Sequence, residues 1–199
     1  MEIKPTVDYD FEVGYLPIKL SILIATMPSR KQHLLELWKM LGANRIVMFP
    51  NVEIITDDRL DYNIGIKRNK LLLQAKGEYI VYIDDDDEIA SNYVPLILQA
   101  IQSGADCIGI SGIITTNGQD KRQWHISKEY GHWHTAPDGT YLRTPNHISP
   151  VKRELALQAG FPEIAFGEDA EYSRRLLPLL KTEVKIEQNI YHYKYVSQK

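Results

Sequence analysis

The sequence has very little cysteine and no long apolar run. Cys107 is the only cysteine among 199 residues and stands in an apolar stretch, so an internal disulfide is excluded and a buried structural thiol is expected. No apolar run reaches the roughly 18 residues that a membrane-spanning helix requires. The first residues, from Met1 on, lack the apolar core of a secretory signal. We therefore expect no membrane span and, by default, a cytoplasmic protein.

The sequence also lacks an excess of basic charge. Its formal net charge of -3 gives no support to a chain-wide nucleic-acid surface. The second half is nevertheless locally basic, with Lys121, Arg122, Lys128, Arg143, Lys152 and Arg153. A hydrophobic fraction of 44% and a charged fraction of 25% are typical of a soluble globular protein. The length allows a proper core, and we expect one domain over residues 1–199.

Strand and helix patterns alternate along the chain. Strands are expected at Lys19–Thr26, Arg45–Phe49, Val52–Thr56, Tyr79–Ile83, Asp106–Ile114, Val184–Ile186 and Ile190–Tyr195. Helices are expected at Lys31–Leu41 (Ser29 as N-cap, Gly42 at its end), Ile66–Lys76 (closed by Gly77), Tyr93–Ser103, Pro150–Gly160 and Ala170–Leu180. This alternation predicts an α/β fold with a mostly parallel central sheet and helices on both faces.

Residues 115–147 differ from the rest because they are polar and rich in Gly, Trp, His and Tyr. Such a region is a functional loop, a small hairpin unit or a disordered insert, and its aromatic residues argue against disorder. Its aromatic side chains, Trp124, Tyr130, Trp133 and Tyr141, fit either stacking on a sugar or base or packing in the core. Its histidines do not favour zinc, since a structural zinc site would usually recruit cysteines as well.

The most informative stretch is the acidic run at the end of one expected strand. Tyr79–Ile83 reads as a buried strand, and Asp84–Asp87 and Glu88 follow it directly. Five adjacent carboxylates repel one another and need a cation, basic partners or open water. Ligands of parallel α/β sheets gather at the carboxyl ends of strands, and Mg²⁺ joins one or two carboxylates to substrate phosphates. An isolated acidic run is usually solvated, but the preceding strand favours a metal site here.

Three smaller clusters carry further candidate chemistry. The first follows the first strand and runs from Thr26 to Arg30; taken alone it is also consistent with a simple turn. The second is the pair Asp57-Asp58 together with Lys67 and Arg68, for which a solvated helix face is the alternative. The third is the pair Glu168-Asp169, which also suits the positive end of a helix dipole without any catalysis.

Taken in order, these clusters resemble those of a family 2 glycosyltransferase of GT-A fold. The matching stretches are Ser21-Ile-Leu-Ile-Ala-Thr26, Asp57-Asp58, Gly65-Ile-Lys-Arg68-Asn69, Ala75-Lys-Gly77-Glu-Tyr-Ile-Val-Tyr-Ile-Asp84-Asp-Asp86-Asp87-Glu and Gly167-Glu168-Asp169. They cover about residues 19–180. One departure is the stretch Arg59-Leu-Asp61-Tyr, which stands where the family usually has Gly-Ser-Thr-Asp.

The resemblance implies a role for each matching residue. Contacts to the nucleotide-sugar donor are implied for Thr26, Arg30, Asp57, Asp58, Arg68, Asp84 and Asp85. Metal ligation is implied for Asp86, Asp84 and His192. Asp169 matches the catalytic base, with Glu168 as its companion. Residues 1–114 would then form the donor half, and residues 115–199 the acceptor and catalytic half.

The reaction so implied is an inverting transfer from a UDP-linked sugar to a hydroxyl, dependent on Mn²⁺ or Mg²⁺. A divalent cation neutralises the diphosphate leaving group, and a carboxylate takes the acceptor's proton. The acceptor is left open among carbohydrate, protein and nucleic acid. The alternatives are a nucleotidyltransferase, although Ala25–Arg30 lacks a Gly-rich phosphate loop, and a non-catalytic nucleotide- or sugar-binding module of the same fold.

Overall fold

The computed structural model describes residues 16–43 and 46–197. The strands are β1 (Leu20–Ala25), β2 (Val52–Asp57), β3 (Tyr79–Tyr82), β4 (Glu88–Ile89), β5 (Cys107–Thr116), β6 (Gln119–Ile126), β7 (His134–Thr135), β8 (Tyr141–Arg143), β9 (Val151–Lys152) and β10 (Glu183–Tyr195). The helices are α1 (Lys31–Ala43), α2 (Ile64–Gln74), α3 (Tyr93–Ala100), α4 (Arg153–Ala159) and α5 (Glu168–Leu176).

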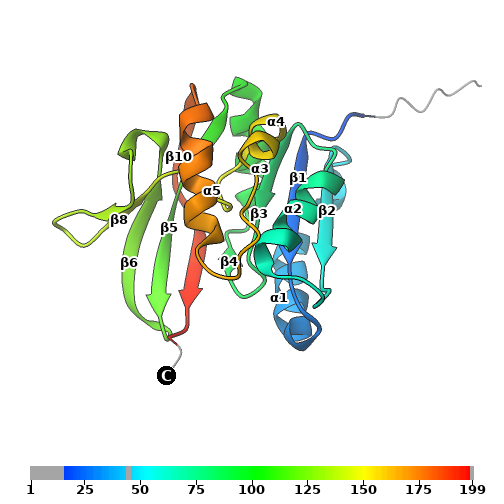
Figure 1. Cartoon of the computed structure of the whole chain (residues 1–199), viewed down its shortest axis with the longest axis horizontal. Coiled ribbons are helices and arrows are strands. Elements are labelled where there is room, and N and C mark those ends of the chain that lie inside the picture. The colour runs from blue at the N-terminus through cyan, green and yellow to red at the C-terminus, as the bar shows by residue number, and fades with distance from the viewer. Residues whose placement is uncertain (1–15, 44–45, 198–199) are drawn as a thin grey trace, which may run out of the picture.

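One continuous sheet runs through the molecule in the order β2-β1-β3-β9-β5-β6-β8-β7 (Figure 1). The strands β2, β1 and β3 are parallel, whereas β9 is antiparallel to both β3 and β5. The long strand β10 runs parallel to β5 and antiparallel to β4. The expected α/β fold is confirmed, and the sheet is mixed when taken as a whole.

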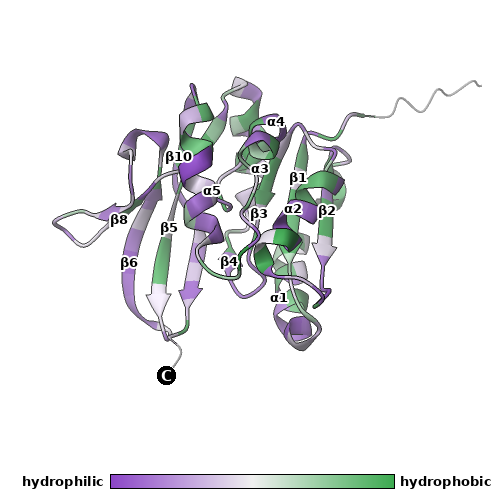
Figure 2. Ribbon diagram, viewed as in Figure 1, coloured by the Kyte–Doolittle hydropathy of each residue, from purple (hydrophilic) through white to green (hydrophobic). Residues whose placement is uncertain are grey.

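Helices cover both faces of the parallel strands, because successive side chains of a strand point to opposite faces. On one face Ile22 of β1 lies in a core cluster with residues of α1 and α3, and on the other Leu23 lies in a cluster with residues of α2, α4 and α5. Burial on both faces explains the unbroken apolar sequence of β1 and β3, which Figure 2 shows as apolar ribbons at the centre of the molecule.

The first half differs from the sequence expectation at two places. The strand predicted at Arg45–Phe49 is wrong: Ile46–Met48 forms a 3₁₀ turn, while Arg45 lies outside the described residues. Val47 is 92% exposed, so this short apolar run does not enter the core. The helix at Lys31 follows a 3₁₀ turn at Pro28–Arg30, so Ser29 is not its N-cap, and Gly42 lies within α1.

Gly77 does not close α2, whose C-cap residue is Ala75, but it has another purpose. A Cβ on Gly77 would lie 2.6 Å from the backbone nitrogen of Ser21, and the Gly77 N–H donates to the Ser21 hydroxyl over 2.8 Å. Glycine therefore allows the chain to pass directly against β1 before it enters β3.

The second half is more strand-rich than expected. Residues 115–147 form a small strand unit, in which β6 is antiparallel to β5 and β7 is antiparallel to β8, while β6 and β8 are parallel. A small hairpin unit was one of the three alternatives for this region. The helix expected from Pro150 begins only at Arg153, because Val151 and Lys152 pair with β3 as β9. The two expected closing strands are one strand, β10, interrupted by register shifts between Lys185 and Tyr191.

Candidate active site

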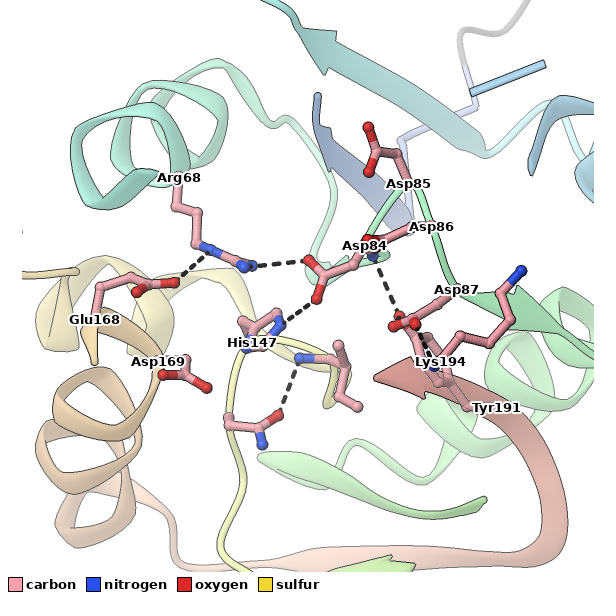
Figure 3. A network of polar contacts seen from close by, with 12 residues as sticks. Arg68, Asp84, Asp85, Asp86, Asp87, His147, Glu168, Asp169, Tyr191 and Lys194 are labelled. Carbon is pink, nitrogen blue, oxygen red and sulfur yellow. Dashed lines mark hydrogen bonds and ion pairs between the residues drawn. The ribbon is translucent and has the colours of Figure 1, made fainter. Parts of the chain in front are cut away.

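The four aspartates after β3 point in different directions and have different partners (Figure 3). Asp85 turns toward β1, where its buried carboxylate accepts hydrogen bonds from the Thr26 hydroxyl over 2.5 Å and from Arg30 Nη1 over 2.7 Å. Asp85 therefore fixes Thr26 and Arg30 at the carboxyl end of β1. The Asp85 side chain itself is fully buried.

Asp87 joins the acidic turn to the last strand. Its carboxylate accepts hydrogen bonds from the Tyr191 hydroxyl and from the backbone N–H of Lys194, both over 2.8 Å. Burial, reinforced by the charge of Asp84, raises the pKa of Asp87 to about 8. This residue thus ties the turn after β3 to β10, although more than 100 residues separate its partners from it.

Asp84 is held between two basic side chains. Its carboxylate lies 3.2 Å from Arg68 Nη2 and 3.1 Å from His147 Nε2, and its backbone N–H donates to the Tyr191 hydroxyl. Burial alone would raise the pKa of Asp84. The charges and hydrogen bonds of His147 and Arg68 instead lower it below its ordinary value. Asp84 is therefore ionised and fixed in direction.

Asp86 is the most open of the four carboxylates. Its side chain is 34% exposed and lies 3.3 Å from Arg30 Nη1. Partial burial, followed by the charges of Asp84 and Asp85, raises its pKa despite the opposing charge of Arg30. A bound cation would stabilise the ionised form of such a carboxylate.

The residues of the acidic turn fit one common mode of divalent-cation binding. Within residues 16–43 and 46–197, no three His, Cys, Asp or Glu side chains are grouped as a complete protein metal site. Mg²⁺ commonly uses only one or two carboxylates together with substrate phosphates. Asp86 fits that mode, in which a bound diphosphate would supply further ligands.

Arg68 connects the acidic turn to the start of α5. The buried guanidinium lies between Asp84 and Glu168, whose Oε1 is 3.4 Å from Arg68 Nε, and over the rings of Tyr82 and Phe161. Glu168 is therefore occupied with Arg68. Asp169 follows it in the first turn of α5 and turns toward the open space beside His147 (Figure 3).

That open space is a cavity of about 430 Å³. It is lined by Asp84, Ile114, Thr116, Trp124, Ile126, Trp133, Tyr141, Arg143, Asn146, His147, Ile148, Asp169, Tyr193 and Tyr195. Two carboxylates thus share a largely aromatic and aliphatic cavity with one arginine. This composition is typical of a pocket that binds a small organic group and orients it through a few polar side chains.

A second, smaller cavity of about 170 Å³ lies at the ends of β1 and β2. Thr26, Arg30, Arg59, Tyr62 and Lys67 are among its lining residues. Buried Lys67 donates to the backbone oxygen of Thr26 over 2.6 Å, so its charge supports the loop after β1. The acidic turn adjoins both cavities, because Asp84 lines the first, and Asp85 binds Arg30, which lines the second.

Asp57 lies buried at the end of β2, whereas Asp58 is exposed. The Asp57 carboxylate accepts four hydrogen bonds, from the Arg59 backbone N–H, Arg59 Nε, Arg59 Nη2 and the Tyr62 hydroxyl. Burial would raise the pKa of Asp57, but these bonds to Arg59 and Tyr62 lower it. The stretch Arg59–Tyr62, which departs from the family pattern, is therefore what engages Asp57.

His192 is placed differently from the candidate metal ligand Asp86. Its ring nitrogens lie 3.0 Å from Glu88 Oε2 and 3.0 Å from the Thr115 hydroxyl. Its neighbours on β10, Tyr191 and Tyr193, face the acidic turn and the large cavity, and side chains alternate along a strand. A role of His192 as a metal ligand stays a prediction.

Comparison with known proteins identifies the family of this chain. The model of "Glycosyl transferase family 2" matches residues 31–167, which include the acidic turn and Arg68. The chain belongs to glycosyl transferase family 2. A search of curated proteins found no match to the sequence. The resemblance inferred from the motifs is thereby confirmed.

Solved structures of S. aureus TarS share the fold of this family 2 chain. The complex of TarS 1–349 with UDP-GlcNAc aligns with a TM-score of 0.66 at 17% identity, covering 92% of this chain and 60% of that one. The complex with UDP aligns with a TM-score of 0.65 at 17% identity, covering 89% and 60%. The chain thus spans about 60% of the TarS fragment's length. At this identity the likeness establishes the fold alone.

Several contacts of the site have no signal in the local sequence. Thr26, Arg30, Arg68 and the acidic turn lie together, as the motifs led us to expect. The attachment of Asp84 and Asp87 to Tyr191 was missed, because its partners lie more than 100 residues away in sequence. Arg59 and Tyr62 were missed as partners of Asp57, although an Arg and a Tyr within five residues of an acid were a usable signal.

Proposed function

We propose that this family 2 chain is an inverting glycosyltransferase that moves a sugar from a UDP-linked donor to an acceptor hydroxyl. The observation that carries the proposal is that Asp169 and Asp84 line the same cavity. On the donor side, Asp85 of the acidic turn binds Thr26 and Arg30, which line the smaller cavity. The separation of a base from a leaving-group site is what a direct displacement requires. The UDP and UDP-GlcNAc complexes of TarS support the choice of donor.

In this proposal the nucleotide occupies the smaller cavity and its diphosphate lies against Arg30 and Asp86. Arg30, held by Asp85, offers a fixed positive charge to the phosphates. Asp86 would hold Mn²⁺ or Mg²⁺ together with the diphosphate, and the cation would neutralise the charge that develops on the leaving group. Asp84, fixed by Arg68 and His147, then borders the donor sugar.

Asp169 is proposed to act as the general base in the larger cavity. Its carboxylate takes the proton of the acceptor hydroxyl while the oxygen forms a bond to the anomeric carbon. The bond between that carbon and the diphosphate oxygen breaks, and its electron pair leaves with the UDP. Because attack comes from the face opposite the leaving group, the anomeric configuration inverts. Glu168 positions this helix start through its ion pair with Arg68.

The substitution Asp169→Asn tests the base. It keeps the shape of the side chain but removes its proton-accepting charge, so release of UDP from a UDP-sugar in the presence of mixed glycan acceptors should fall at least about 100-fold. UDP binding, measured by calorimetry, should stay within a factor of two. Asp120→Asn is the matched control, since Asp120 is exposed at the start of β6 and should behave as the wild type. Full activity of the Asp169 variant, or loss of its UDP binding, would exclude this role.

The substitution Asp86→Asn tests the metal. In the wild type we expect Mn²⁺ to strengthen UDP binding and EDTA to abolish that gain. Mn²⁺ without UDP should bind weakly, because the residues that the structure describes include no complete ligand set. The Asp86 variant should bind UDP equally with Mn²⁺ and with EDTA. A wild-type affinity for UDP that ignores Mn²⁺ would exclude the proposed metal dependence.

A further inference from the structure

The reaction proposed above assigns no role to Arg143, a cationic side chain that lines the large cavity. Arg143 stands on β8, at the far side of the sheet from β1 (Figure 1), and lines the cavity that also contains Asp84 and Asp169. Its guanidinium carbon lies 4.8 Å from the ring centre of Tyr141 and 5.4 Å from that of Trp133. Both rings line the same cavity.

The Arg143 side chain is held in place by neutral groups. Nη1 donates to the backbone oxygens of His134 over 2.8 Å and of Leu142 over 3.1 Å. The indole of Trp133, which stacks beside it, is itself fixed by a 2.9 Å hydrogen bond to the Thr144 hydroxyl. The guanidinium is therefore positioned before any ligand arrives, and its Nε and Nη2 take part in neither of the Nη1 hydrogen bonds.

Arg143 differs from the other arginines of the site because it lacks a counter-charge. Arg30, Arg59 and Arg68 each form an ion pair with an aspartate. Within the described ranges, no Asp or Glu forms an ion pair with Arg143. Its partial burial lowers its pKa, which shows that the surroundings disfavour the charge. A partly desolvated cation is costly unless an anion meets it.

We propose that Arg143 binds a carboxylate or phosphate group of the acceptor, and that the large cavity is a subsite for an anionic sugar. This inference rests on the proposed function, because it places the acceptor next to Asp169. A planar guanidinium with free donors is suited to bidentate binding of either anion. Trp133 and Tyr141 would pack against the sugar ring, between the anionic group at Arg143 and the acceptor hydroxyl at Asp169.

The charges of the cavity also orient such an acceptor. Asp84 and Asp169 repel an anionic group from their own part of the cavity, while Arg143 on β8 attracts it. The hydroxyl end is thereby left facing Asp169. The donor is a poorer candidate for Arg143, because its diphosphate is assigned to Arg30, which lines the other cavity, and to Asp86, which pairs with Arg30.

Direct binding of three monosaccharides tests this subsite. Glucuronate, glucose 6-phosphate and glucose are titrated into the UDP-loaded and the nucleotide-free protein, followed by NMR line broadening of each sugar. We expect at least one anionic sugar to bind about tenfold more tightly than glucose or better, with a preference that weakens as salt is raised. The two anionic arms distinguish a carboxylate from a phosphate as the natural group.

Two variants assign the preference to Arg143. Arg143→Gln should lower the affinity for the preferred anion to that for glucose, and Arg143→Lys should retain part of it. Arg122→Gln is the matched control, since Arg122 also lies over Tyr141, at 5.7 Å, but is exposed and does not line the cavity. It should keep the full preference.

The outcomes separate this inference from the proposed function. Equal binding of all three sugars, no binding at tens of millimolar, or an unchanged preference in Arg143→Gln would overturn the anionic subsite. UDP binding would still stand in that case as evidence for the donor site. Conversely, an Arg143-dependent preference without any UDP binding would retain the subsite and remove the transferase proposal.

Discussion

At the scale of single residues, Asp57 is a candidate base-binding carboxylate whose hydrogen-bond acceptor positions are already filled by neighbouring side chains. An ionised carboxylate has about four lone-pair positions, and Arg59 and Tyr62 fill all four. The N3–H of a uracil base is therefore unable to donate to Asp57 unless one of these donors leaves. Arg59 is exposed and able to leave, whereas Tyr62 is only partly exposed.

We therefore predict that Arg59→Ala strengthens the binding of uridine several-fold, because it frees acceptor positions on Asp57. Uridine, which has no phosphate, is the right probe because the lost positive charge cannot then weaken an anion contact. Calorimetry on wild type, Arg59→Ala and the control Asp120→Asn measures the effect. Weaker uridine binding in Arg59→Ala would mean that Arg59 itself contacts the base.

The residues of the candidate site were predictable from sequence where they directly follow a strand or stand at the start of a helix. Thr26, Asp57 and Asp84 come directly after apolar runs, and the carboxyl ends of parallel strands meet at one edge of the sheet. Their partners were not predictable, since His147 and Tyr191 reach Asp84 from elements distant in sequence, and no local pattern encodes such a contact.

At the scale of elements, the sequence did not predict the short strands or the eight-residue β6, which lies in the region left open between loop, hairpin and disorder. Two-residue strands such as β4 and β9 have no periodicity, and their pairing is imposed by β3, β5 and β10. The position of β9 is reinforced by Asp106, whose carboxylate accepts bonds from Lys152 Nζ and from the backbone N–H groups of Lys181 and Thr182 over 2.8–3.0 Å. One carboxylate thus connects β9 to the start of β10.

The substitution Asp106→Asn should lower the free energy of unfolding at pH 7 by about 1–3 kcal/mol, because hydrogen bonds to a charged acceptor are lost. Burial would raise the pKa of Asp106, but Lys152 and the two N–H groups lower it to about 2. Since the folded-state pKa lies below the unfolded value, this stabilisation is present above about pH 4 and is lost as the pH falls toward 2.

Urea unfolding between pH 7 and pH 2.5 measures this contribution. The difference between wild type and Asp106→Asn should shrink as the pH falls below about 4, while Asp120→Asn tracks the wild type throughout. A difference that is constant over the whole pH range would show that the charge of Asp106 contributes nothing.

At the scale of the whole molecule, the expected donor and acceptor halves share one sheet. β9, from the second half, is inserted between β3 and β5, and β10 pairs with both β4 and β5. The Asp87–Tyr191 and Asp84–His147 bonds add side-chain links between the halves. In the described part of the chain, no helix is long and apolar enough to span a bilayer.

This interleaving predicts that the two halves unfold together, as a single domain would. Trp38 in α1 reports on the first half, and Trp124, packed against Tyr191, reports on the second. Two variants, one keeping only Trp38 and one keeping only Trp124, are unfolded in urea and followed by tryptophan fluorescence and far-UV circular dichroism. Within each variant the two signals should have one midpoint and one slope, because neither half can lose its strands without exposing β3 or β5 as an open edge. Separate transitions, with Trp124 changing before or after the bulk of the helix signal, would instead show that residues 1–114 and 115–199 behave as two domains.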